Sequence, residues 1–218
     1  MTESDYGAVV TSRLREQYFL LLPKLRLLAA RIETEIRYHL RKIAQELEPY
    51  EQIVVRSRVK DCESAIRKLK GEGNVFAPEQ TYSLVDLNDL AGVRVLVFPS
   101  KRLSQTDVLL RTVEPFNTWS SDPLKYAGNS HWAPKYQGTF NEISTDIKCE
   151  YQILPMLIGS FYEVEHSAMY KPVGWAKGAD RDEFLKDLRQ QIEESLERFE
   201  KRFEDFVELN RRSSSLQT

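Results

Sequence analysis

Cationic side chains gather in one short segment of the sequence, and their spacing suits a polyphosphate ligand. Residues 56–70, RSRVKDCESAIRKLK, contain six lysines and arginines in fifteen positions. If this segment is a helix, Lys60, Ser64 and Lys68 lie four residues apart on one face, beside Arg67. The opposite face would carry the apolar side chains of Val59, Cys62, Ile66 and Leu69. Such a helix packs on a core and presents its cations outward, either to phosphate groups or, in the alternative, only to solvent.

Two carboxylates stand near strand-like runs further along the chain. Asp89 precedes residues 92–98, GVRVLVF, and Glu150 lies within residues 146–154, DIKCEYQIL. If the two strands are neighbours in one sheet, the carboxylates can meet although they are far apart in the sequence. Carboxylate oxygens and substrate phosphates are the ligands that Mg²⁺ prefers, so the pair predicts a Mg²⁺ site. A turn or cap role for Asp89 and a surface position for Glu150 are the alternative.

Hydrophobic periodicity and proline positions predict long helices at both ends of the chain. Residues 11–22 predict a helix that ends at Pro23, and residues 25–47 predict an amphipathic helix that ends before Pro49. Residues 180–210 repeat the amphipathic pattern, with leucine, isoleucine and phenylalanine on one side. We expect these apolar stripes to pack on each other or on one sheet, with a coiled-coil dimer as the alternative.

The middle of the chain predicts a sheet with helical and irregular connections. Residues 92–98 and 146–154 are expected to be strands of a shared sheet. Residues 101–113 predict a helix between them, whereas residues 117–141 predict mostly loop with at most a short strand. The expected fold is one α+β domain with a central mixed sheet flanked by helices. Its parts are N-terminal helices at 1–50, a core at 51–172, a C-terminal helix at 180–210 and a disordered tail at 211–218.

Composition limits the class of protein. The 218 residues are 41% hydrophobic and 29% charged, which is ordinary for a globular domain. The net charge of −2 and the pI near 6.0 give no general attraction to DNA or to an anionic membrane, so an anion site must be local. No apolar run reaches the length of a membrane span and the N-terminus has no signal-peptide pattern, so we expect a cytoplasmic protein. Cys62 and Cys149 are expected to be reduced, and the three histidines form no zinc motif with them.

Four segments follow one another at compatible spacing, namely RVKDCESAIRKL at 58–69, DLNDLAGVRVLVF at 86–98, KCEYQIL at 148–154 and FYEVEHSAMYKP at 161–172. In this order they resemble the synthetase domain of RelA/SpoT-type (p)ppGpp synthetases, and above all the small alarmone synthetases that lack a hydrolase domain. The resemblance implies a nucleotidyltransferase-like synthetase fold with a mixed sheet between helices. It also implies a GTP pyrophosphokinase that transfers pyrophosphate from ATP to the 3′-hydroxyl of GDP or GTP, with Mg²⁺ as cofactor.

Position by position, the resemblance implies an ATP site. Arg58 and Arg94 would clamp the adenine ring, which agrees with the tendency of guanidinium planes to stack on aromatic bases. Lys60, Ser64 and Lys68 would bind the phosphates, for which an ammonium group is a compact partner.

The same resemblance implies the catalytic and acceptor groups. Asp89 would be the principal Mg²⁺ ligand, and Glu150 would bind metal or accept the proton of the attacking hydroxyl. Phosphoryl-type transfer needs mainly positioning and neutralisation of charge, which a metal, a cation cluster and one carboxylate supply. Gln152 shares a strand face with Glu150 by the two-residue period and could contact the acceptor nucleotide. Glu165 and His166 could steady the site, or serve only as cap or core residues.

The acceptor side departs from the family pattern. Leu154-Pro155 stands where the family has an Arg-Thr pair, which removes a cation and leaves acceptor choice open. The family's Gly-Tyr-x-Ser-x-His segment has no clean match, and the nearest stretch is KYAGNSHWAPKY at residues 125–136. The candidates for base stacking and for the family histidine, each with loop packing as the alternative, are Tyr126, Trp132, Tyr136 and His131.

Three functions stay open at this point. The first is (p)ppGpp synthesis from guanine nucleotides, and the second is that of a toxin-like relative that pyrophosphorylates adenine nucleotides or the 3′ end of tRNA. An RNA-binding edge could then be formed by Lys125, Lys135, Lys171 and Lys177. The third is an inactive nucleotide-binding regulator, against which the presence of both Asp89 and Glu150 argues. The sequence decides neither a homo-oligomer nor an antitoxin partner.

Overall fold

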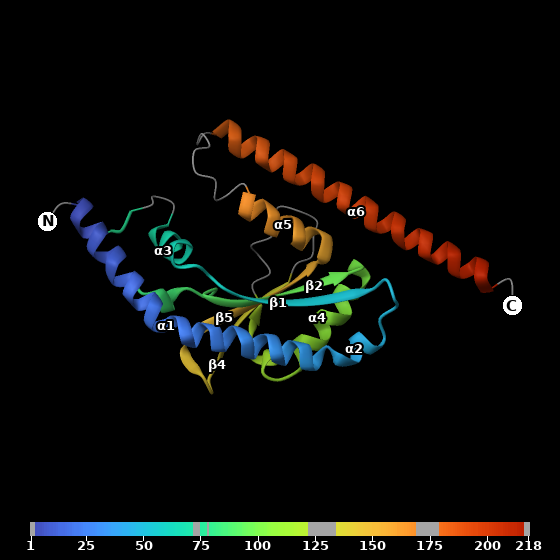
Figure 1. Cartoon of the computed structure of the whole chain (residues 1–218), viewed down its shortest axis with the longest axis horizontal. Helices are drawn as coiled ribbons and strands as arrows, with labels where there is room; N and C mark the ends of the chain where they lie inside the picture. The colour runs from blue at the N-terminus through green and yellow to red at the C-terminus, as the bar shows by residue number, and fades with distance from the viewer. Residues whose placement is uncertain (1–2, 72–74, 78, 122–133, 169–178, 216–218) are drawn as a thin grey trace.

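A five-stranded mixed sheet forms the centre of the molecule, with helices on both of its faces (Figure 1). The computed structural model describes residues 3–71, 75–77, 79–121, 134–168 and 179–215. The strands are β1 (Gln52–Val59), β2 (Ala91–Phe98), β3 (Ser120–Ser121), β4 (Lys135–Phe140) and β5 (Ser144–Pro155), in the order β1-β2-β5-β4-β3. β2 and β5 are parallel, and the other neighbouring strands are antiparallel. The predicted α+β fold with a central mixed sheet is confirmed.

Helices α1 and α4 lie on one face of the sheet and α5 lies on the other, with α6 outside α5 (Figure 1). The α-helices are α1 (Glu3–His39), α2 (Arg41–Gln45), α3 (Cys62–Lys70), α4 (Leu103–Thr112), α5 (Met156–Ala168) and α6 (Ala179–Ser215). Short 3₁₀ helices cover Leu84–Asp86, Ser100–Arg102 and Phe116–Thr118. Within the described part of the chain, no helix combines the length and the apolar character that a membrane crossing requires.

Helix α1 continues through Pro23, so the predicted break at this proline is wrong. Leu14 and Tyr18 before the proline and Leu25 and Leu28 after it are all buried. The packing of this common face outweighs the amide donor that proline lacks. A single helix therefore crosses the sheet where two were expected.

The cationic segment 56–70 is not one helix, which corrects the prediction made for it. Its first residues belong to β1, where Arg56 and Arg58 alternate with the β-branched and small side chains that favour a strand. α3 begins only after Asp61, whose carboxylate caps the helix by accepting a hydrogen bond from the Ser64 amide (2.9 Å). The cations are therefore divided among a strand, a short connection and a helix.

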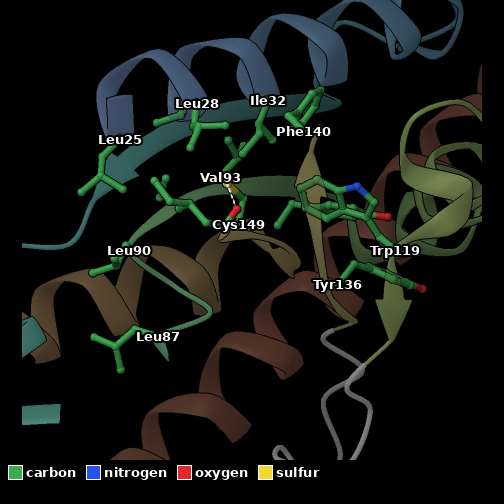
Figure 2. Packing of buried hydrophobic residues seen from close by; sticks show 14 of the residues in the cluster. Leu25, Leu28, Ile32, Leu87, Leu90, Val93, Trp119, Tyr136, Phe140 and Cys149 are labelled. Carbon is green, nitrogen blue, oxygen red and sulfur yellow. Dashed lines mark hydrogen bonds between the residues drawn. The ribbon is translucent and has the colours of Figure 1, made fainter. Parts of the chain in front are cut away.

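The two faces of the sheet differ because side chains alternate along each strand. The face under α1 carries buried apolar side chains, namely Val93, Val95 and Val97 of β2 and Cys149, Tyr151 and Ile153 of β5. In this core, Leu25, Leu28 and Ile32 of α1 lie close to Val93 and Cys149 (Figure 2). Both Cys62 and Cys149 are free thiols, as predicted.

Helix α5 covers part of the opposite face. Gly159 allows its close approach, because a Cβ atom there would lie 2.5 Å from Leu96 Cδ2 and 3.3 Å from Leu154 Cβ. Leu96 and Leu154 are consequently buried beneath the helix. The apolar part of this face is thus used for packing, and the rest is left for polar groups.

Helix α6 contacts α5 and one end of the sheet, on the side away from α1 (Figure 1). Of the two predicted arrangements of the long helices, the described residues therefore fit packing on one sheet and not packing on each other. The Phe203 ring lies 5.7 Å from the Tyr50 ring and 5.6 Å from the Phe98 ring. Arg211 pairs with Glu48 at 2.8 Å. The helix runs to Ser215, so the disordered tail predicted for residues 211–218 is wrong for 211–215, and residues 216–218 lie outside the described part of the chain.

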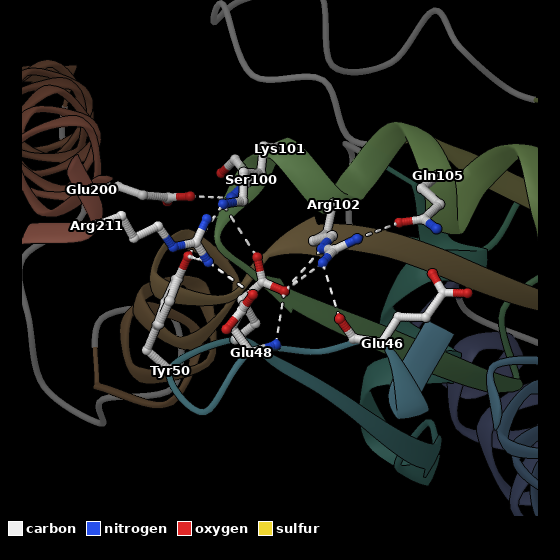
Figure 3. Close-up of polar contacts among 10 residues, drawn as sticks. Glu46, Glu48, Tyr50, Ser100, Lys101, Arg102, Gln105, Glu200 and Arg211 are labelled. Atoms are coloured by element: carbon white, nitrogen blue, oxygen red, sulfur yellow. Dashed lines mark hydrogen bonds and ion pairs between the residues drawn. The ribbon is translucent and has the colours of Figure 1, made fainter. Parts of the chain in front are cut away.

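A buried carboxylate holds this end of the sheet together. Glu51 accepts hydrogen bonds from Arg102 Nε (3.0 Å) and Nη2 (2.6 Å), and Lys101 Nζ lies 3.2 Å from its other oxygen. Lys101 and Arg102 lie on the short helix that follows β2, next to Ser100, whose amide donates to Glu200 of α6 (Figure 3). Burial alone would raise the pKa of Glu51, but the hydrogen bonds and charges of Arg102 and Lys101 outweigh it and bring the pKa below the ordinary 4.5.

Replacing Glu51 by Gln should destabilise the fold by about 2 kcal/mol, because two cations lose their buried partner. Since the pKa of Glu51 is lowered in the folded state, its contribution is present above the ordinary value of 4.5 and is lost as pH falls through the folded-state pKa. Thermal unfolding followed by circular dichroism should therefore show a smaller acid-induced decrease in Tm for Glu51→Gln than for the wild type. Equal acid sensitivity of the two proteins would contradict this assignment.

Candidate active site

The sheet face opposite α1 carries two rows of polar side chains outside the part covered by α5. The strand register places Arg58, Gly92, Glu150 and Gln137 side by side in one row. The next row contains Arg56, Arg94, Gln152 and Lys135. Charged groups from four neighbouring strands therefore share one surface.

Glu150 is the buried centre of the first row, with 2% of its surface exposed. Gln152 donates a hydrogen bond to its Oε1 atom at 2.6 Å. Lys135 Nζ lies 2.6 Å from Oε2, and Arg58 Nη2 lies 3.8 Å from Oε1. An amide donor and two cations thus fix the position of this carboxylate within the sheet.

Gly92 separates Arg58 from Glu150 without adding a side chain of its own. A Cβ atom at this position would lie 3.1 Å from the Glu150 carbonyl oxygen and 3.9 Å from Arg58 Nε. The glycine therefore lets the Arg58 side chain lie over β2, with its Nη2 atom 3.8 Å from the Glu150 carboxylate.

Asp89 forms a second charged centre, just before β2. Its Oδ2 atom lies 3.0 Å from Lys60 Nζ and 2.9 Å from Lys68 Nζ. Burial alone would raise the pKa of Asp89, but the hydrogen bond from Lys68 and the charges of both lysines outweigh it, so the pKa is below its ordinary value. The carboxylate is therefore ionised at neutral pH and already lies between two ammonium groups.

The donor atoms of this centre fit a hard divalent cation. Asp89 Oδ1 is buried and has no hydrogen-bond partner among the described residues, so a carboxylate oxygen is open to a further ligand. The described ranges contain no group of three or more His, Cys, Asp or Glu side chains arranged for metal binding. A Mg²⁺ ion here would accordingly take most of its oxygen ligands from phosphate groups and water.

Helix α3 contributes the remaining cationic surface. Ser64 lies one turn before Lys68 on α3, so the two side chains share a helix face. Lys60 belongs to the connection between β1 and α3, where its amide donates to the Leu90 carbonyl at 2.8 Å. The structure thus brings Lys60 and Lys68 to the same carboxylate, although the helix predicted to carry both begins only after Lys60.

Glu163 of α5 is a site residue that the sequence did not reveal. Its two oxygens lie 2.7 Å from Arg56 Nη1 and 3.4 Å from Arg94 Nη1, so one carboxylate links guanidinium groups of neighbouring strands. The sequence drew attention to Glu165 and His166, whose side chains lie outside the described residues. Glu163 is distinguished from the other acidic residues of this segment only by the packing of α5 on the sheet, which brings its carboxylate to the two arginines.

Lys135 is the second residue that sequence reasoning missed, because it was considered only as part of an exposed RNA-binding edge. Its side chain is 13% exposed and pairs with Glu150, so it does not behave as a scattered surface lysine. The signal that could have found it is the alternation of β4 against β5, which places Lys135 opposite Gln152. That signal depends on a pairing of strands that the sequence did not predict.

Of the two roles predicted for Tyr136, the structure favours packing in the protein over stacking on an acceptor base. Tyr136 is 5% exposed and lies on the core side of the sheet (Figure 2). Its ring stacks on that of Tyr151, with the centroids 4.8 Å apart. Its hydroxyl donates to Asp107 at 2.5 Å, and burial raises the pKa of this phenol. The strand period therefore directs its ring away from Glu150 and Gln152.

The other predicted acceptor residues have different outcomes. Tyr126, His131 and Trp132 lie outside the described residues, and their roles stay predictions. Gln152 is on the same face as Glu150, as expected. Leu154 and Pro155, which replace the family's Arg-Thr pair, are both buried in the sheet next to α5.

No protein-family model and no curated protein matches the sequence. Solved structures match in fold. Small alarmone synthetase 1 from Bacillus subtilis is similar with a TM-score of 0.64 and 15% identity, over 90% of this chain and 99% of that chain. Structures of the same protein bound to AMPCPP and to its product pppGpp give TM-scores of 0.61 and 0.63, each with 14% identity and the same coverage.

A second solved protein is also similar to this chain in fold. A GTP pyrophosphokinase family protein from Streptococcus pneumoniae is similar with a TM-score of 0.58 and 20% identity, over 89% of this chain and 96% of that chain. The chain therefore has the fold of the small alarmone synthetases, which the sequence resemblance had predicted.

Replacing Tyr136 by Phe tests its assignment to the core. Loss of the hydroxyl should reduce the free energy of unfolding by about 1–2 kcal/mol, because buried Asp107 loses a hydrogen-bond donor. Chemical denaturation measures this change, while calorimetry with ATP and with GDP should give unchanged affinities. A selective loss of GDP binding at unchanged stability would return Tyr136 to the acceptor site.

Proposed function

We propose that this protein transfers pyrophosphate from ATP to the 3′-hydroxyl of GDP or GTP and so makes (p)ppGpp. The observation that carries the proposal is the pair of charged centres, Asp89 with two lysines and Glu150 with its donors, on one sheet of the small alarmone synthetase fold. The AMPCPP and pppGpp bound by the similar Bacillus subtilis protein support an adenine-nucleotide donor and a guanine-nucleotide product.

The donor binds to the Asp89 centre and to Arg58 and Arg94 of strands β1 and β2. Lys60 and Lys68 neutralise phosphate charge, and the guanidinium groups of Arg58 and Arg94 stack on the adenine ring. Glu163 holds Arg94 by an ion pair at 3.4 Å and so restricts the positions of its guanidinium group. Arg58 and Arg94 lie in adjacent rows of one sheet face on the neighbouring strands β1 and β2, so their guanidinium groups can approach the same adenine ring.

Asp89 is the residue that would hold Mg²⁺, through its open Oδ1 atom. When bound, the ion neutralises charge on the transferring phosphates and fixes their orientation. The ammonium groups of Lys60 and Lys68 at Oδ2 keep the carboxylate ionised and correctly turned.

Glu150 accepts the proton of the acceptor's 3′-hydroxyl group. At the same time the oxygen of that hydroxyl group forms a bond to the β-phosphorus of ATP. The bond from the β-phosphorus to the oxygen that bridges it to the α-phosphorus breaks, and AMP leaves with that oxygen. Gln152 supports this step, because its hydrogen bond to Oε1 orients the carboxylate.

Lys135 takes the place of the missing cation on the acceptor side. Leu154 is buried beneath α5 and, like Pro155, carries no charge, whereas Lys135 of β4 points to the face that carries Glu150. The ammonium group of Lys135 can therefore contact Glu150 and a phosphate of the acceptor at the same time.

The function is tested with purified protein, Mg²⁺ and γ-labelled ATP, offered GDP, GTP, AMP, ATP or bulk tRNA as acceptor. GDP or GTP should gain the label. Asp89→Asn and Glu150→Gln should each reduce transfer by at least about a hundredfold, because each removes a charge and preserves shape. Thermal unfolding serves as the folding control.

The other outcomes separate the alternatives. Label on adenine nucleotides or tRNA, with guanine nucleotides unlabelled, would favour the toxin-like relative. Binding of ATP without transfer to any acceptor would favour the inactive regulator. Transfer at the wild-type rate in either variant would remove that carboxylate from the mechanism.

Lys135→Met should lower kcat/KM for the acceptor by at least about tenfold, since a charge-assisted phosphate contact is lost. The affinity for ATP should stay within about twofold, because the donor phosphates bind at the other centre. Lys135→Arg keeps the charge and should retain most activity, and Lys42→Met, at an exposed lysine of α2, should have no effect. An unchanged acceptor kcat/KM in Lys135→Met would leave the lysine a purely structural partner of Glu150.

A further inference from the structure

Polar side chains in the first half of α1, residues 3–22, reach the segment of chain that joins β1 to β2. Figure 1 shows this half of the helix beside α3, which belongs to that segment. Arg13 Nη2 donates to the Tyr82 carbonyl at 2.9 Å, and Arg15 Nε donates to Glu63 of α3 at 2.8 Å. The same segment carries the lysines of the Asp89 centre, so α1 is in contact with the part of the chain that forms the donor site.

Tyr18 makes such a contact at the centre itself. Its hydroxyl donates a hydrogen bond of 2.9 Å to the carbonyl oxygen of Lys60. The Tyr18 side chain is buried in the core cluster, and this burial, together with the nearby Cys62 and Asp61, raises the pKa of its phenol. The hydroxyl therefore keeps its proton and remains a hydrogen-bond donor.

This contact completes the anchoring of the Lys60 backbone. The Lys60 amide donates to the Leu90 carbonyl at 2.8 Å, and the Lys60 carbonyl accepts from Tyr18. The next residue, Asp61, caps α3 by accepting a hydrogen bond from the Ser64 amide at 2.9 Å. The orientation of the peptide between Lys60 and Asp61 thus determines both where the lysine side chain begins and where α3 begins.

The ion pair with Asp89 cannot position the Lys60 ammonium group in the same way once a nucleotide is bound. In the free protein Lys60 Nζ lies 3.0 Å from Asp89 Oδ2. A bound phosphate competes for this ammonium group, whereas the backbone contacts of Lys60 do not involve the ligand. A lysine stem has several rotatable bonds, whose freedom is lost when the ammonium group binds phosphate. Anchoring the base of the stem reduces that loss in advance.

We propose that Tyr18 is a positioning residue of the donor site, whose hydroxyl holds the Lys60 peptide so that the Lys60 ammonium group meets the phosphates of ATP. The proposal rests on the proposed function in one respect, namely that Lys60 binds donor phosphate. It gives a role in nucleotide binding to a residue of α1 that lies 42 positions before Lys60 in the sequence.

Gln17, the residue before Tyr18, supports the other side of the same centre. Its side chain donates to Ser83 Oγ at 2.7 Å and accepts from the Leu84 amide at 2.9 Å. Leu84 is fully buried and begins the short helix that leads to Asp89. Two consecutive residues of α1 therefore hold the two chain segments that bring Lys60 and Asp89 together. A site whose parts are fixed to one packed helix keeps its geometry while a ligand binds.

The first test is the affinity for the ATP analogue AMPCPP in the presence of Mg²⁺, measured by calorimetry on the full chain. Tyr18→Phe removes the hydroxyl and keeps the buried ring, and its Kd should rise about fivefold, which corresponds to the loss of one hydrogen bond. Tyr6→Phe is the matched control, because the Tyr6 hydroxyl of the same helix also donates to a backbone carbonyl, that of Gln80 at 3.3 Å. Its Kd should stay within about twofold of the wild type. Thermal unfolding confirms that both variants are folded.

The second test asks whether the hydroxyl acts through Lys60. Lys60→Met is combined with Tyr18→Phe in a double-mutant cycle. In the Lys60→Met background, adding Tyr18→Phe should change the Kd for AMPCPP by less than about twofold, because the ammonium group to be positioned is absent.

The third test is kinetic and uses the wild type and Tyr18→Phe. With GDP as acceptor, the variant should show a KM for ATP about fivefold higher, whereas the KM for GDP should stay within about twofold. A general loosening of the fold would raise both values.

Four results would overturn the proposal. A Kd of Tyr18→Phe within about twofold of the wild type would do so, as would an equal loss of affinity in Tyr6→Phe. A full fivefold loss in the Lys60→Met background would show that the hydroxyl does not act through Lys60. An equal rise in the KM for GDP would assign Tyr18 to general stability. Failure of the proposed function would look different, because a wild type that binds AMPCPP but labels neither GDP nor GTP leaves the binding cycle intact.

Discussion

The parallel pairing of β2 with β5 places Gly92 beside Glu150 and Arg94 beside Gln152, and the whole polar surface depends on that register. Side chains alternate along a strand, so the same register directs Val93 and Tyr151 into the core under α1. A shift of one residue would exchange these two sets and bury the charged ones without partners. The large apolar surface under α1 therefore also determines where the charged groups lie. Core and site are two consequences of one strand pairing.

The charged groups of the site are stabilised before any ligand arrives. Asp89 is held by two lysines and Glu150 by Lys135 and Gln152, so neither carboxylate is buried without compensation. This arrangement has an energetic consequence for nucleotide binding. A phosphate that approaches the lysines competes with Asp89 for them, so part of the electrostatic gain is offset by the weakening of an existing ion pair. A cation bound at Asp89 Oδ1 would relieve that competition, because it gives the carboxylate a further positive partner when the lysines turn to the phosphate.

Much of the fold could be predicted from local signals. The β-branched run before Pro99 and the alternating run before Pro155 are neighbouring strands, with Asp89 just before the first and Glu150 within the second, as expected. Predictions failed where the structure is determined by contacts between residues that are far apart in the sequence. The helix through Pro23 is stabilised by packing on a sheet that forms from residues far along the chain. Tyr136 lies in the core because of its pairing with Tyr151, and Glu163 reaches two arginines only because α5 folds back over the sheet. None of these contacts leaves a periodic pattern in the sequence.

The order of the site residues along the chain separates two parts of the proposed reaction. The groups assigned to the donor come from β1, α3 and β2, whereas Lys135, Glu150 and Gln152 come from β4 and β5. Substitutions in the second half of the gene could therefore alter which acceptor is used and leave the recognition of ATP unchanged. Duplicated copies of such a gene would be free to diverge in product while they draw on the same donor. Gly92 lies between the two groups of residues, because it pairs with Arg58 of the donor group on one side and with Glu150 of the acceptor group on the other.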